Sequence, residues 1–236
     1  MNHDRHRAAL VALVCALLLI VSGTEAWAHG VADGDKGFIH EATGVLIGPF
    51  IYLGAKHMVT GYDHLLFLVG VVFYLYRLRD VATYVTLFAV GHSVTLLFGV
   101  IAKIGVSAHL VDAVIGFSVV YKALDNLGTL ERWLGFQPNP KYATLGFGLI
   151  HGFGLATKLL DFELPPKGVV INLVAFNVGV EAGQLLALSA ILIVLGYWRQ
   201  QPSFTRTAFG ANVTLMIAGA ALTLYQLAGY FGATGA

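Results

Sequence analysis

Long apolar blocks dominate this sequence, and their length limits what the chain can fold into. Hydrophobic residues make up 57% of the 236 positions and charged residues only 11%, roughly half the charged share of a typical soluble domain. The mean hydropathy is +0.76. The blocks are close to the roughly 20 residues that a helix needs to cross a bilayer. We therefore expect an integral membrane protein with an all-α fold, a polytopic membrane helix bundle.

Six transmembrane helices are predicted from the position of these blocks. They cover about 61–78, 80–103, 109–127, 142–160, 168–197 and 207–230. The preceding segment, 44–60, is apolar but is interrupted by Gly48, Pro49 and Gly54, so we interpret it as a short interfacial or re-entrant helix. The chain has 28 glycines, which suits helices that pack closely without a hydrophobic drive between them. No soluble domain or internal repeat is recognisable, so residues 29–236 are expected to form a single integral membrane domain.

The N-terminal 28 residues have the pattern of a secretory signal peptide. A basic start is followed by an apolar stretch over 8–21 and by the small-x-small sequence that ends at Ala28. Cleavage there would make His29 the mature N-terminus, and the alternative is an uncleaved first membrane helix. The single cysteine, Cys15, lies inside this segment. A mature chain without cysteine would have neither disulfides nor thiolate metal sites.

The arginines indicate how the helices are oriented. Every arginine after the predicted signal peptide falls in the segments around 77–80, 128–141 and 198–206. Because cytoplasmic loops are enriched in basic residues, these segments are predicted to be cytoplasmic and the mature N-terminus periplasmic, in a bacterial inner (plasma) membrane. The net charge is +1 and no basic run occurs, so the expected partner is the lipid bilayer and not nucleic acid.

Histidines and carboxylates interrupt the apolar blocks, where titratable groups are costly and usually mark an ion or substrate path. His57, Asp63 and His64 stand at the start of an apolar run in "HMVTGYDHLLFLV", and His92 and His151 lie within later blocks. Imidazoles suit Ni, Co, Cu and Zn, whereas an all-oxygen site would suit Mg or Ca. The candidate metal ligands are His57, Asp63, His64, His92, His151 and Glu181.

Two local arrangements remain open at this point. On a continuous helix His57 and His64 would share one face, but Gly61 is expected to break that helix, and the two rings would then converge across a turn. Asn177, Glu181 and Gln184 have the spacing of a single helix face. Candidate supporting residues are Asn177, Gln184, Asp112, Asp125 and Ser93. Each of these also has an ordinary role, as an interhelical hydrogen bond or as a charge that reaches the interface.

Five segments together resemble a known family. They are "HMVTGYDHLLFLVGVVF", "TLFAVGHSVTLLFGV", "VDAVIGFSVVYKALDNL", "GFGLIHGFGLA" and "FNVGVEAGQLLAL". In this order they resemble successive blocks of the HupE/UreJ family, in its second branch, over about residues 50–190. The resemblance implies a secondary transporter of nickel or cobalt, linked to hydrogenase, urease or cobalamin metal supply. The family's first motif, His, five residues, Asp-His, is matched by His57, Asp63 and His64. The better-studied branch has a second histidine-rich motif, in which this chain has only His151.

The leading hypothesis is a permease for a divalent transition metal, Ni²⁺ first and Co²⁺ second, without an organic cofactor. His57, Asp63 and His64 would capture the ion near the outer face, with His29 and His40 as outer collectors. A separate midplane site would consist of His92, His151 and Glu181, assisted by Asn177 and Gln184. Because no phosphate-binding loop is present, ATP drive would require another subunit.

Two alternatives come from other functional classes. A membrane-integral metalloenzyme would gather three ligands around one point and keep an open position on the metal. An accessory subunit would deliver or sense metal within a membrane complex, together with metalloenzyme maturation proteins, without moving the ion across. A homo-oligomer is compatible with each hypothesis.

Overall fold

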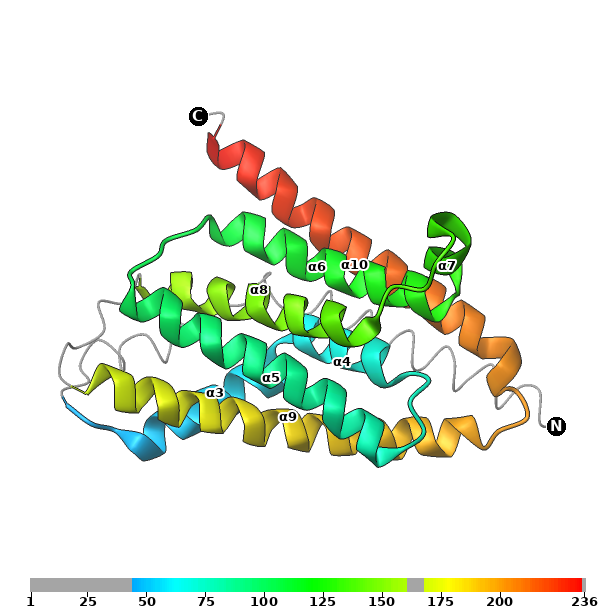
Figure 1. Cartoon of the computed structure of the whole chain (residues 1–236), viewed down its shortest axis with the longest axis horizontal. Coiled ribbons are helices and arrows are strands. Elements are labelled where there is room, and N and C mark those ends of the chain that lie inside the picture. Colours follow the sequence, from blue (N-terminus) through cyan, green and yellow to red (C-terminus); the bar gives the residue numbers. More distant parts are fainter. Residues whose placement is uncertain (1–43, 161–167, 235–236) are drawn as a thin grey trace.

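The computed structural model describes residues 44–160 and 168–234, and all regular secondary structure in these two ranges is helical (Figure 1). The helices are α3 (Ile47–Thr60), α4 (Tyr62–Val72), α5 (Leu78–Ile101), α6 (Ala108–Asn126), α7 (Thr129–Leu134), α8 (Pro140–Leu160), α9 (Val169–Arg199) and α10 (Phe204–Thr234). The all-α prediction is therefore confirmed. The predicted signal peptide, His29 and His40 lie outside the described residues.

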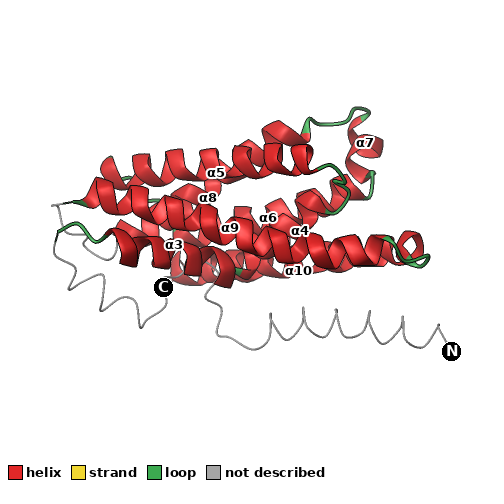
Figure 2. Ribbon diagram, turned by 90° about the horizontal axis from the view of Figure 1, so that it is seen from below, coloured by secondary structure: helices red, strands yellow, loops and turns green. Residues whose placement is uncertain are grey.

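The long helices pack in three pairs, α3 with α9, α5 with α8, and α6 with α10. Figure 2 shows them running side by side as a bundle. The first two pairs are parallel and the third is antiparallel. The contacts that fix the directions of the last two pairs are Gly91 with Leu149, Gly99 with Ala156, His109 with Gln226, and Asn126 with Asn212. Successive long helices of the chain therefore run in opposite directions, as consecutive crossings of one layer require.

The first crossing consists of two helices. At its start the backbone N–H of Leu46 donates to Asn172 Oδ1 at 2.8 Å, and at its end the Arg199 guanidinium donates to the carbonyls of Val72 and Phe73. Thus α3 and α4 together follow α9 from end to end, although the chain leaves the helical conformation at Gly61 (φ −72, ψ 97).

The predicted span 61–78 is therefore wrong. Helix α4 has only 11 residues, or about 16 Å at 1.5 Å per residue, too short for the roughly 30 Å of a hydrocarbon core. Helix α4 ends at Val72, where Arg199 donates to the carbonyls of Val72 and Phe73, whereas apolar residues continue to Tyr76. Segment 44–60 contributes the other half of this crossing. It lies along α9, within the bundle, and this is not the position of an interfacial helix.

The other five predicted spans agree with the structure to within a few residues. Helices α5, α8, α9 and α10 are long and apolar enough to cross a membrane. Helix α6 has 19 residues and has charged side chains at both ends, Asp112 near its start and Lys122 and Asp125 near its finish. Together with the broken first crossing, these helices traverse the bundle six times.

The loops divide the described chain between two ends of the bundle. Loops 73–77, 127–139 and 200–203 lie at one end, which we call the arginine end, on the right in Figure 1. Residues 44–46, 102–107 and 168 lie at the opposite end. The five predicted cytoplasmic arginines all belong to the arginine end, as the predicted topology requires. Which side of the membrane this end faces stays a prediction.

Two large apolar clusters, and a small third one around Phe73 and Phe204, fill the described part of the bundle. One includes Phe50, Met58, Leu96 and Leu155 and lies toward the opposite end. The other lies toward the arginine end and includes Phe67, Phe88, Val119 and Leu188. Helices α3 and α9 meet without intervening side chains, since a Cβ added at Gly54 would collide with the carbonyl of Phe176, and one at Gly179 with that of Ile51. Small residues thus bring the two backbones into direct contact.

This contact predicts a strong position dependence for alanine within α9. Gly179→Ala should destabilise the protein by about 1–3 kcal/mol, because the added methyl group collides with backbone that cannot move aside cheaply. Gly196→Ala, in the same helix, adds a methyl group to open space and should be neutral or slightly stabilising. Thermal unfolding of the detergent-solubilised variants checks this. Equal melting temperatures for the two variants would contradict the packing described.

Candidate metal centre

The break at Gly61 brings two histidines together. His57 lies in the last turn of α3, and His64 lies in the first turn of α4. Their ring centroids are 5.0 Å apart, with the planes at 76°. Of the two arrangements that the sequence left open, the structure therefore shows convergence across a turn. Neither ring lies at the surface, since His57 is 7% exposed and His64 is completely buried.

A third imidazole, that of His92 on α5, completes the group. One ring nitrogen from each of His57, His64 and His92 lies within 4.8 Å of the other two. Nitrogens that bind one Zn²⁺ ion tetrahedrally at about 2.0–2.1 Å lie roughly 3.3–3.4 Å apart. A small inward movement of these side chains would therefore place all three on one ion. We call these three residues the histidine cluster.

Asp63 fixes the orientation of the His64 ring. Its Oδ1 accepts the backbone N–H of His64 at 2.9 Å and lies 3.1 Å from His64 Nδ1. A carboxylate behind a ligating histidine sets its tautomer and raises its basicity. With Nδ1 turned toward Asp63, Nε2 is the nitrogen of His64 that would bind a metal.

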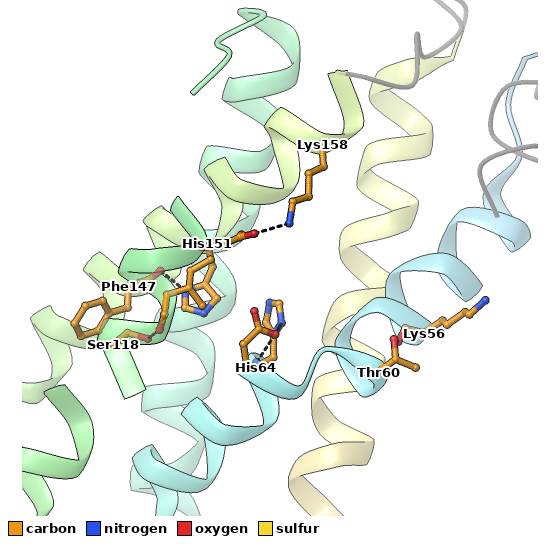
Figure 3. A network of polar contacts seen from close by, with 10 residues as sticks. Lys56, Thr60, His64, Ser118, Phe147, His151 and Lys158 are labelled. Carbon is orange, nitrogen blue, oxygen red and sulfur yellow. Dashed lines mark hydrogen bonds and ion pairs between the residues drawn. The ribbon is translucent and has the colours of Figure 1, made fainter. Parts of the chain in front are cut away.

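His151 lies beside the histidine cluster. Its ring centroid is 5.1 Å from that of His64, and its Nδ1–H donates to the carbonyl of Phe147 at 2.7 Å (Figure 3). Our expectation of two separate sites, an outer one with His57 and His64 and a midplane one with His92 and His151, is therefore wrong. All four imidazoles lie in one region, because α4 begins at the level that α5 and α8 reach near their middles.

The residues of α9 differ from the expected arrangement. Asn177 and Gln184 are buried, at 7% and 1% exposure, whereas Glu181 is exposed. Glu181 is about 40° further around the helix than Asn177, enough to turn it to the outer surface. The prediction that the three share an inward face is wrong for Glu181. Asn177 approaches the His92 ring without reaching hydrogen-bond geometry.

Ser93 also points away from the centre. It is only partly buried and follows His92 by one residue, which turns its side chain about 100° around α5. The buried hydroxyl of this helix is that of Thr95, which donates to the carbonyl of Leu149 at 2.6 Å and joins α5 to α8. Thr95 therefore has the ordinary structural role of an interhelical hydrogen bond.

The two aspartates of α6 lie at opposite ends. Asp125 is paired with Lys122 at 2.5 Å and accepts from Gln137 at 2.6 Å, near the arginine end. Asp112 is buried toward the opposite end and forms an ion pair with Lys158 of α8 at 2.9 Å (Figure 3). Of these two aspartates, only Asp112 lies in the part of the bundle that contains the histidines. Asp125 belongs to a polar network near the helix ends.

A layer of phenylalanines closes the centre toward the arginine end, and this feature was missed in the sequence. Phe67, Phe88 and Phe147 each lie about one helical turn from a histidine of the same helix. The Phe88 ring lies 5.3 Å from that of Phe67, and 4.8 Å from that of His151. The signal was available, since a phenylalanine follows His64 by three positions or precedes His92 and His151 by four.

Gly61 is needed for space and not for its backbone conformation. Its φ of −72 suits any residue, but an added Cβ would lie 2.7 Å from His64 Nδ1 and 3.1 Å from Asp63 Oδ1. Gly61→Ala should therefore displace the Asp63–His64 contact and weaken binding of a divalent transition metal about 10–100-fold, the usual effect of losing such a partner.

Calorimetric titration of the purified variants with Ni²⁺ or Co²⁺ measures this effect. Gly48→Ala is the matched control, because a Cβ at that position of α3 meets nothing within 4 Å. Unchanged affinity in Gly61→Ala would show that this contact does not tune the site.

Comparison with known protein families gives one match. A family model described as "HupE / UreJ protein" matches residues 33–234, nearly the whole chain, and confirms the resemblance drawn from the motifs. Comparisons with curated proteins and with solved structures found no match. The matched family is transporter-like and is associated with nickel and cobalt transport. The chain belongs to the HupE/UreJ family.

Proposed function

We propose that this protein is a secondary transporter that carries a divalent transition-metal ion through the histidine cluster, with Ni²⁺ as the first substrate and Co²⁺ as the second. The observation that carries the proposal is the convergence of His57, His64 and His92, from three helices, on one buried point. Buried imidazoles are costly inside a membrane and usually serve an ion path. Family membership supports the same reading.

The broken first crossing fits transport. In many transporters the ion site lies where a membrane helix is interrupted near its middle, because unwound backbone and helix ends face the ion there. Here the interruption falls between His57 and His64, with Asp63 at the first turn of the second half. A site on such a joint changes its geometry when the two half-helices move relative to each other.

The ligand types fit an ion that is bound and then released. Imidazoles suit borderline divalent metals, and protonation of an imidazole competes with the metal for the same nitrogen. The phenylalanine layer separates the centre from the arginine end, so passage in that direction requires Phe88 and its neighbours to move. If the arginine end is cytoplasmic, the ion enters from the periplasmic side and release requires this movement.

Transport by the purified protein tests the proposal. Liposomes that contain the protein are offered Ni²⁺, Co²⁺, Zn²⁺, Cu²⁺ and Mn²⁺ in turn, and accumulated metal is measured. We expect uptake of one or two of these ions, with uptake abolished in His64→Ala and Asp63→Ala because the ligand or its orienting carboxylate is lost.

Two variants serve as matched controls. His109 is an exposed histidine of α6 that donates to Gln226, and Glu181 is the exposed carboxylate of α9. His109→Ala and Glu181→Gln should retain uptake. Normal uptake by His64→Ala at limiting metal would refute the proposed route, as would uptake that depends equally on His109.

A membrane metalloenzyme is the second candidate, because three imidazoles at one point also resemble a catalytic metal site with an open position. Hydrolysis would need water at this point, yet His64, His92 and His151 are all completely buried. Tight metal binding without uptake by any liposome would favour this reading, or that of an accessory subunit. Hydrolytic turnover by the metal-loaded protein would then separate the two.

A further inference from the structure

A positive charge lies beside the proposed metal route. Lys158 follows His151 by seven residues on α8, so it lies on nearly the same face, about 10 Å nearer the opposite end. Its Nζ is 2.9 Å from Asp112 Oδ2, and the two side chains are only 17% and 7% exposed. Figure 3 shows Lys158 directed inward from α8, in the region of His151 and His64.

The Lys158 ammonium also acts on the centre itself. The side chain extends from α8 toward the region of His64 and His151 (Figure 3), and a charge there acts over several ångströms in the low-dielectric interior. A fixed positive charge near the histidine cluster repels an arriving divalent cation. A transporter that only needed tight capture would be better served by a neutral side chain at position 158.

Stability alone gives a weak reason for the pair. Burying two charges costs several kcal/mol per ion in desolvation, and well-packed apolar replacements are often equally or more stable. The Asp112–Lys158 pair joins α6 to α8, but these helices also pack directly, with a Cβ at Gly154 reaching Val111. The position of the charge near the metal centre offers a better account.

We propose that Lys158 is a built-in counter-cation that balances Asp63 and Asp112 while the histidine cluster is empty, and that it sets the metal affinity low enough for release. The inference rests on the proposed function, since it requires metal at the histidine cluster. With both carboxylates ionised, the region carries two negative charges and Lys158 offsets one. An arriving divalent ion therefore meets one net negative charge instead of two, and the positive charge of Lys158 weakens its binding.

Opposite charge changes test this idea by calorimetric titration with Ni²⁺. Lys158→Met removes the positive charge and should tighten binding at least about tenfold, whereas Asp112→Asn leaves the lysine unbalanced and should weaken it by a similar factor. Lys158→Arg should stay near the wild-type affinity. The double variant Asp112→Asn with Lys158→Met should return toward it. Lys103→Met, an exposed cation at the same end, is the matched control and should have no effect.

The outcomes separate this inference from the proposed function. Folded Lys158→Met and Asp112→Asn proteins that both bind Ni²⁺ within about twofold of wild type would overturn the role of Lys158 and leave the metal site intact. Equal weakening in both variants would indicate a structural pair and would also overturn it. Wild-type protein that binds no metal would overturn both proposals. If Lys158→Met does not fold, Lys158→Gln removes the charge in its place, and the same outcomes decide the inference.

In liposomes, the tighter binding of Lys158→Met should lower both the KM for metal and the maximal rate, because release becomes slower. Loss of rate without a change in KM would contradict a role in setting affinity.

Discussion

The break at Gly61 is the feature on which the rest of the centre depends. It lies between two anchored half-helices, since α3 is held against α9 by backbone contacts at Gly54 and Gly179, and the end of α4 is held by Arg199. The chain therefore cannot straighten into one helix without losing one of these two anchors. In this fixed geometry His57 and His64 face each other and Asp63 lies behind His64. Helices α5 and α8 then supply further imidazoles at the same level.

The surroundings of the centre differ in the two directions along the bundle. Toward the opposite end lies the charged Asp112–Lys158 pair, and toward the arginine end lies the phenylalanine layer. A small ion can exchange water for carboxylate oxygens in the first direction, whereas aromatic rings offer it no ligand in the second. The asymmetry follows from the positions of three helices, each of which places a phenylalanine about one turn from its histidine.

Much of the centre was predictable because titratable groups are rare in these apolar blocks. His57, Asp63, His64, His92 and His151 all stood out for that reason, and the structure brings them together. Glu181 stood out equally but is exposed on α9. Spacing along a helix gives the angle between side chains but not the rotation of that helix against its neighbours. For the same reason the sequence separated His92 and His151 from the first motif, and it did not reveal that Lys158 reaches Asp112.

The sequence by itself determined the membrane class, five of the six crossings and the family, because hydropathy and motifs depend on residues that are close together in the chain. Only the tertiary structure decided that the first crossing is a pair of half-helices, because that depends on glycine contacts and an arginine cap more than 100 positions away in the chain. It also decided which polar residues meet. Convergence requires helix rotation and depth, and both are set by close packing between segments that no local pattern connects.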